Sequence, residues 1–191
     1  YDVKLDMRMN TEQKISAYDV VNTYTEEQLS KIIFEYGEER HARKIAKLVV
    51  EERKSSPIEK TSDLITLIKR AYPERASKHP AKKTFQAIRI EVNRELEVLG
   101  NAISKAAELL KVGGRLAIIT FHSLEDRIVK NKFKDLATAC KCPKDIPICV
   151  CGGVKKFEII TKKPIIPIDD ELKNNNRAHS SKLRILERIL D

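Results

Sequence analysis

The spacing of apolar side chains predicts that the first half of the chain is helical. Apolar residues recur every three or four positions, which is the period of a helix with one buried face. The first strong signal begins with a capping box formed by Thr25 and Gln28, and it ends at Gly37, which suits a left-handed helix end. A later helix is expected to be capped by Thr61. In total, the period predicts helices over residues 25–37, 38–54, 61–72 and 82–110.

The stretch over residues 82–110 is long enough to bridge two lobes of a protein. Its apolar period continues on both sides of Gly100. Because glycine weakens the interior of a helix, we expect a kink or a break at Gly100.

The apolar period changes after Gly113-Gly114. Residues 115–121 form a short, continuously apolar run, which is typical of a strand buried on both faces. Ser123 is expected to cap the helix that follows. Helix, strand and helix in this order predict a unit of a parallel α/β sheet, and further strand signals lie over residues 157–161 and 182–187. The predicted fold class is therefore α/β.

The composition indicates a basic protein with enough apolar residues for a folded core. The 191 residues include 37 Lys and Arg against 28 Asp and Glu, giving a formal net charge of +9, and 41% of residues are hydrophobic. Most of the excess positive charge lies in residues 127–191. A positive electrostatic field of this kind favours binding of a polyanion. The alternative is that the lysines only keep the surface of the protein solvated.

Localisation follows from two further features of the composition. No apolar run reaches the roughly 20 residues of a membrane helix, and the N-terminus does not resemble a signal peptide. The cysteines are confined to residues 140–151, which argues against a disulfide framework. We therefore expect a soluble, cytoplasmic protein without a membrane partner, and a chain that starts within a longer protein.

The residues after the predicted strand at 115–121 form the first candidate site. His122, Ser123 and Asp126 follow the carboxyl end of this strand, where open α/β sheets place their ligands. The alternative is an ordinary capped helix start with a solvated His122. The Gly-x-Ser-x-Gly pattern is absent, so a hydrolase nucleophile at Ser123 is not expected.

Two further groups of side chains suit a polyanionic ligand. Gln86, Arg89 and Asn93 are three or four residues apart, so they share a helical face that can reach phosphate or a base edge, unless it is only a polar surface stripe. The strongest candidates for phosphate contacts are the basic residues Arg127, Lys130, Lys132 and Lys134.

The cysteines form two C-x-C pairs, Cys140 with Cys142 and Cys149 with Cys151. Four thiols match the ligand count of a tetrahedral zinc site, but structural zinc sites prefer longer spacers within each pair. Nearby lysines also repel a dication. The sequence therefore favours a reduced loop that needs no metal. The six glycines form neither a G-x-G-x-x-G loop nor a P-loop, the usual cradles of nucleotide-like cofactors.

Several ordered motifs resemble one family, the bacterial small-subunit ribosomal RNA cytosine-N4 methyltransferases. These motifs run in order along essentially the whole chain: Leu5-Asp6-Met7-Arg8-Met9-Asn10, Tyr36-Gly37-Glu38-Glu39-Arg40, His79-Pro80-Ala81, Thr84-Phe85-Gln86-Ala87-Ile88-Arg89-Ile90, Gly113-Gly114-Arg115-Leu116, Phe121-His122-Ser123-Leu124-Glu125-Asp126-Arg127-Ile128-Val129-Lys130, Cys142-Pro143, Cys149-Val150-Cys151, Thr161-Lys162-Lys163-Pro164 and Asn176-Arg177-Ala178-His179-Ser180-Ser181-Lys182-Leu183-Arg184.

The resemblance implies the C-terminal part of a class I, Rossmann-like methyltransferase sheet together with an inserted helical domain. In this reading residues 10–95 are the inserted, substrate-recognition domain, and residues 96–191 hold strands five to seven with a cysteine-containing loop at 138–154. Family members carry the cofactor loop in a further N-terminal part that this sequence lacks. The 191-residue chain alone is therefore expected to have little or no activity.

The implied function is N4-methylation of a cytosine in small-subunit ribosomal RNA with S-adenosylmethionine as cofactor. The implied partner is this RNA or the assembled small ribosomal subunit, and a homodimer is left open. By position, His122, Ser123 and Asp126 are the candidate catalytic residues. The candidate RNA-binding residues are Gln86, Arg89, Asn93, Arg127, Lys130, Lys132 and Lys134. The alternative function is a non-catalytic RNA-binding or ribosome-assembly module.

Overall fold

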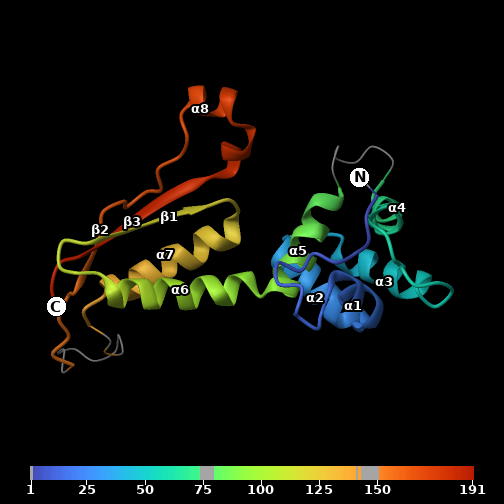
Figure 1. The fold of residues 1–191 in the computed structure, drawn as a ribbon, viewed down its shortest axis with the longest axis horizontal. Coiled ribbons are helices and arrows are strands. Elements are labelled where there is room, and N and C mark those ends of the chain that lie inside the picture. The colour runs from blue at the N-terminus through green and yellow to red at the C-terminus, as the bar shows by residue number, and fades with distance from the viewer. Residues whose placement is uncertain (1, 74–79, 141, 143–150) are drawn as a thin grey trace. The chain divides into compact units, whose positions relative to one another are not determined.

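The computed structural model describes residues 2–73, 80–140, 142 and 151–191 (Figure 1). The chain divides into two compact units, residues 1–95 and residues 96–191. The first unit is helical and the second combines helices with a small sheet, so the predicted α/β class is confirmed. Among the described residues, no helix is both long and apolar enough to cross a membrane.

The first unit is a bundle of helices around one apolar core. Its helices are α1 (Ala17–Thr23), α2 (Glu26–Gly37), α3 (Ala42–Glu52), α4 (Thr61–Ala71) and α5 (Ala81–Asn93). Helix α2 packs against both α3 and α5. Leu29, Ile45, Leu64 and Ile88 come from four different helices and are all almost fully buried, as the apolar spacing predicts.

Helix α2 begins as predicted but ends differently. The Thr25 hydroxyl accepts a hydrogen bond from the Gln28 amide, and the Gln28 side chain accepts one from the Thr25 amide. At the C-terminal end of α2, the residue with a left-handed backbone is Glu38, with φ of 48°, and not Gly37. Gly37 has a different role, because a Cβ there would lie 2.7 Å from the Lys83 carbonyl oxygen of α5. This glycine therefore allows α2 and α5 to approach closely.

The starts of two other helices also differ from the sequence prediction. Thr61 is the first residue of α4 and not its cap, because Lys60 occupies the cap position and its amide donates to Asp63. Helix α1 was not predicted, because it is too short for its apolar period to be recognised. It has a complete capping box, in which Ser16 and Asp19 bond to each other's backbone amides.

The stretch over residues 82–110 forms two helices and not one long helix. Helix α5 ends at Asn93, Arg94 is left-handed with φ of 50°, and α6 (Glu95–Leu109) follows. Gly100 lies inside α6, so the expected break at Gly100 is wrong. The break occurs at Arg94, directly after Asn93, whose side chain bonds to the backbone of Met7 and Met9.

The second unit contains a three-stranded sheet in the order β1-β3-β2. Its remaining elements are β1 (Arg115–Thr120), α7 (Ser123–Ala137), β2 (Phe157–Ile159), α8 (Asp169–Asn174), the 3-10 helix η1 (Asn176–Ser180) and β3 (Lys182–Arg188). Strand β3 pairs antiparallel with both β1 and β2, so β1 and β2 run in the same direction without pairing. The sequence analysis expected a unit of a parallel sheet, whereas the pairings among the described strands are antiparallel, because β3 lies between β1 and β2.

Within the described part of this unit, one face of the sheet is covered and the other is not. Helices α6 and α7 lie on the same side of the sheet (Figure 1), and Ile103, Phe133 and Leu186 form the centre of the core between them. Ile118 of β1 packs against this core, whereas Ile119 points to the opposite face and is 58% exposed. Strand β1 is therefore not buried on both faces, contrary to the prediction, because no described element of the unit packs on the second face.

Candidate functional site

His122 occupies the turn between the carboxyl end of β1 and the start of α7. It is the N-cap of α7, a role that the sequence analysis gave to Ser123. Its Nδ1 accepts a hydrogen bond from the Glu125 amide at 3.4 Å, while Glu125 Oε2 accepts from the Phe121 amide at 2.7 Å and the His122 amide at 3.2 Å. These bonds fix the imidazole and the strand end as one rigid turn.

The carboxylate of Glu125 stays ionised in this turn. Burial raises the pKa of Glu125, but hydrogen bonds from the His122 side chain and the Phe121 amide outweigh it and hold that pKa below its usual value. The negative charge lies at the positive end of the dipole of α7, which favours it further. Ser123 is the first residue of α7 and is exposed beside His122.

Asp126 lies one turn into α7 and forms a buried ion pair with β3. Its Oδ1 accepts from Arg184 Nε at 2.6 Å, its Oδ2 accepts from a terminal guanidinium nitrogen of Arg184 at 3.1 Å, and Lys182 Nζ lies 3.5 Å from Oδ2. Both carboxylate oxygens are thus engaged by the protein. In this arrangement Asp126 joins α7 to β3 directly behind the turn that holds His122.

The basic residues predicted on α7 divide between two sides of the helix. Arg127, Lys130 and Lys134 are spaced by three and four positions and are exposed, so they share one outward face. Lys132 lies on another side, and its Cε would be 3.7 Å from a Cβ on Gly100 of α6. Three of the four predicted residues thus lie on one exposed face of α7.

A basic pocket of about 450 Å³ lies beside this outward face. We define the basic pocket by its lining residues, which are Lys130, Phe133, Lys134, Ala137, Thr138, Lys155, Glu158, Ile159, Lys162 and Arg184. Among the described residues that line it, Glu158 is the only acidic one, and it pairs with Lys155 at 3.3 Å. The sequence analysis missed Lys155 and Lys162, which flank β2. The signal that could have found them is their position on either side of a predicted strand.

In the first unit, Gln86 and Asn93 bond to the backbone of other segments. Gln86 Nε2 donates to the Tyr36 carbonyl at 3.0 Å, which ties α5 to α2. Asn93 Oδ1 accepts from the Met9 amide at 2.8 Å, and its Nδ2 donates to the Met7 carbonyl at 2.9 Å. The amides of both residues therefore hold the unit together.

Arg89 lies between Gln86 and Asn93 on the same helix and is exposed. Its guanidinium forms two bonds to the Glu95 carboxylate, at 2.8 and 3.0 Å. Arg89 is therefore engaged by a bidentate pair within the first unit, and its side chain is 45% exposed.

The Leu5–Asn10 motif forms a loop that ends against Asn93. Asp6 accepts two bonds from the Arg8 guanidinium, and the charge and hydrogen bonds of Arg8 lower the pKa of Asp6 to about 2. Met7 has a left-handed backbone with φ of 60°, and Met9 is 74% exposed. The motif thus presents an apolar side chain on a fixed loop.

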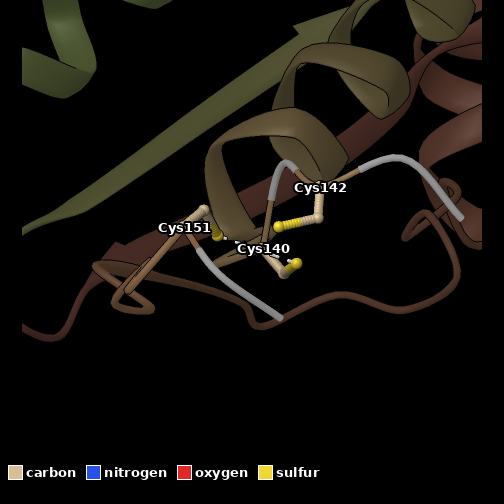
Figure 2. A group of neighbouring side chains, drawn as sticks. All are labelled: Cys140, Cys142 and Cys151. Carbon is tan, nitrogen blue, oxygen red and sulfur yellow. Dashed lines mark hydrogen bonds between the residues drawn. The ribbon is translucent and has the colours of Figure 1, made fainter. Parts of the chain in front are cut away.

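Three cysteines meet where α7 ends and the segment before β2 begins (Figure 2). They are Cys140, Cys142 and Cys151, and their sulfur atoms lie within 4.8 Å of one another. Cys149 and His79, which the sequence analysis also singled out, lie outside the described residues.

Comparison with known proteins identifies the relatives of this chain. The sequence profile of the MraW methylase family matches residues 1–189. A protein named ribosomal RNA small subunit methyltransferase H from Fusobacterium nucleatum subsp. nucleatum is 96% identical over the whole chain. Proteins of the same name from Clostridioides difficile and Caldicellulosiruptor bescii are each 55% identical, over 98% and 97% of the chain.

The chain spans 61% of the length of each of these three relatives. Its match to the family profile extends over nearly every residue, from the Leu5–Asn10 loop to β3. The resemblance read from the ordered motifs is thereby confirmed, and the chain belongs to the MraW methylase family.

Proposed function

We propose that the protein containing this chain transfers a methyl group from S-adenosylmethionine to N4 of a cytosine in small-subunit ribosomal RNA. The observation that carries this proposal is the match of the family profile over residues 1–189, together with relatives named as small-subunit ribosomal RNA methyltransferases. The partner would be this RNA or the assembled small subunit, in the cytoplasm. A homodimer remains a prediction.

The described residues contain no glycine-rich loop that could bind the cofactor. Gly113 has φ of 81° and donates its amide to the Arg188 carbonyl at 2.7 Å, so the Gly113-Gly114 turn serves to join α6 to β1. Gly152 and Gly153 belong to the cysteine loop. We therefore assign to this chain the RNA side of the reaction.

The turn after β1 is the part of this chain that we assign to the target base. The lone pair of a cytosine amine is delocalised into the ring, so a methyltransferase must hold the amine in a fixed orientation. His122 is held by Glu125, and Ser123 is exposed beside it. We assign contacts with the unstacked base to these two residues, and we assign Asp126 the task of positioning them through α7.

The basic pocket and the outward face of α7 are the parts that we assign to the RNA backbone. Lys130 and Lys134 face the same pocket as Lys162, and a flexible ammonium group suits phosphate contacts that carry no sequence information. The distance from His122 to Lys134 along α7 is about 18 Å at 1.5 Å per residue. One RNA strand of a few nucleotides can span this distance.

Activity is tested in a protein of the full length of the relatives. Incubation with small-subunit RNA and S-adenosylmethionine is expected to give N4-methylcytidine, detected by mass spectrometry of the digested RNA. Replacement of His122 by Ala should lower kcat more than it raises KM, because the base would still bind but lose its orientation. Absence of N4-methylcytidine under all conditions would contradict the proposal.

A different experiment separates the enzyme from the alternative of a non-catalytic RNA-binding or assembly module. If the proposal is right, calorimetric titration of the 191-residue chain should show binding of small-subunit RNA without binding of S-adenosylmethionine, and the full-length protein should bind both. A full-length protein that binds RNA but not S-adenosylmethionine would favour the module.

The RNA contacts of the second unit are tested by charge removal. The variant with Lys130, Lys134 and Lys162 changed to Ala should bind RNA more weakly, and its salt dependence should be flatter by about 0.7–0.9 in slope for each lost contact. A matched variant removes three exposed lysines of the first unit, Lys31, Lys44 and Lys47. An equal change in both variants would mean that binding follows net charge alone.

A further inference from the structure

We propose that Cys140, Cys142 and Cys151 form a zinc-binding site in the second unit. The three sulfur atoms converge on one point between the end of α7 and the segment that leads to β2 (Figure 2). The sequence analysis favoured a loop without metal because one-residue spacers strain a chelate. The structure removes that objection, because the sulfur atoms of Cys140 and Cys142 lie within 4.8 Å of each other despite the short spacer.

The distances fit a tetrahedral thiolate site. With Zn–S bonds of about 2.3 Å, the sulfur atoms of a tetrahedral site lie about 3.8 Å apart. The Sγ atoms of Cys140 and Cys151 are 3.8 Å apart. At this distance the Cys151 thiol donates a hydrogen bond to Cys140, and the separation is far longer than the roughly 2.05 Å of a disulfide. Deprotonation of both thiols would leave the same spacing for a shared zinc ion.

Two glycines hold the cysteine segments together independently of the sulfur atoms. Gly152 has φ of 58°, which lets the chain turn sharply after Cys151. At Gly153, a Cβ would overlap the carbonyl group of Ala139. Only glycine permits this close approach of the residues next to Cys140 and Cys151. The backbone is thus shaped to bring these two thiols together before any metal binds.

The charge balance also suits zinc. Three thiolates around Zn²⁺ leave one net negative charge, and this charge is compatible with the neighbouring Lys155 and Lys156. The lysines that repel a free dication therefore stabilise the finished complex. Thiolates prefer zinc to harder cations such as Mg²⁺ and Ca²⁺.

The proposed site would fasten α7 to the segment before β2, next to the basic pocket. Cys140 follows the last turn of α7, and Cys151 precedes Lys155, which lines the pocket. The metal would thereby fix one wall of the pocket. The fourth coordination position is left to water or to another donor, and Cys149 lies outside the described residues and is not part of the proposal.

The first test measures zinc in the 191-residue chain, purified under reducing conditions without an affinity tag. Elemental analysis is expected to give about one zinc per chain after dialysis, held by the three thiolates. Replacement of the zinc by Co²⁺ should produce the thiolate-to-cobalt charge-transfer band and the intense visible bands of tetrahedral coordination. A chain without bound zinc that also gives no such cobalt spectrum would overturn the proposal.

The second test uses single substitutions. Cys140→Ser, Cys142→Ser and Cys151→Ser should each lose most of the zinc and most of the charge-transfer intensity. Ala139→Ser is the matched control, because it introduces the same hydroxyl next to Cys140 without removing a thiol. Circular dichroism checks that each variant is folded. Zinc retained in all three cysteine variants, or lost equally in the control, would overturn the assignment of the ligands.

Discussion

At the scale of single residues, the buried ion pair of Asp126 and Arg184 connects a helix, α7, to a strand of the sheet, β3. The sequence analysis could place Asp126 near the strand end, but it could not pair it with Arg184, which is 58 positions away. Such pairing depends on the order of the strands. From this pair we infer that Asp126 positions α7, while the predicted contact of Asp126 with substrate stays a prediction.

We predict that Asp126→Asn destabilises the second unit. The substitution leaves the buried guanidinium of Arg184 without its charge partner, and a loss of about 3 kcal/mol in the free energy of unfolding is expected. Asp135→Asn on the exposed side of the same helix should change this free energy by less than about 0.5 kcal/mol. Urea unfolding followed by circular dichroism measures both, and equal effects would contradict the prediction.

The same pair predicts a dependence on pH. Hydrogen bonds from Arg184 and the charges of Arg184 and Lys182 outweigh burial and hold the pKa of Asp126 below its ordinary value. An unfolded aspartate titrates near about 3.9, so the stabilisation is complete above that pH and is lost as pH falls through the folded pKa. The stability difference between the wild type and Asp126→Asn should therefore be constant from pH 5 to 7 and shrink below about pH 4.

Asn93 is a residue whose importance the sequence could indicate but not explain. It interrupts a good helix-forming sequence, and the structure shows that its side chain bonds to the backbone of Met7 and Met9. These contacts span more than eighty positions, so periodicity along the chain contains no signal for them.

We predict that Asn93→Ala lowers the free energy of unfolding of the first unit by about 1–2 kcal/mol, because two backbone groups lose their partner. Asn101→Ala, at an exposed position of α6, should leave stability unchanged or slightly higher. Thermal unfolding of both variants checks this. Unchanged stability with weaker RNA binding would instead make Asn93 an RNA contact.

At the scale of elements, local signals predicted the helices well and their junctions less well. The capping box of Thr25 and Gln28 is encoded within four residues, and the structure confirms it. The apolar period continues across the break at Arg94, so periodicity alone predicts one helix where the structure has two. The burial of β1 on one face depends on segments distant in the sequence, because these pack against the strand.

Two glycines inside helices should respond in opposite directions to the same substitution. Gly37→Ala places a Cβ 2.7 Å from the Lys83 carbonyl oxygen, so overpacking should outweigh the gain in helix propensity and cost about 1–2 kcal/mol. Gly100→Ala places a Cβ 3.7 Å from the flexible end of Lys132 and should stabilise α6 by up to about 1 kcal/mol. Urea unfolding measures both, and changes of the same sign would contradict the packing argument.

At the scale of the whole molecule, each of the two units encloses its own core. The first core is built from residues between Leu5 and Val92, and the second from residues between Ile103 and Leu186. The described residues of the second unit form three strands, and Ile119 and Phe121 are more than half exposed on or beside the uncovered face of this sheet. It therefore gains less from burial than a sheet covered on both faces.

We therefore predict that the 191-residue chain unfolds in two steps, the second unit first. All five tyrosines lie in residues 1–95 and the chain has no tryptophan, so tyrosine fluorescence reports the first unit alone. Far-ultraviolet circular dichroism reports helices of both units. With increasing urea, circular dichroism should show an early phase that tyrosine fluorescence lacks, followed by a later phase that both probes share. A fragment of residues 1–95 should reproduce the later phase, because its core needs no residue from the second unit. Coincident transitions for both probes would instead show that the two units unfold as one cooperative structure.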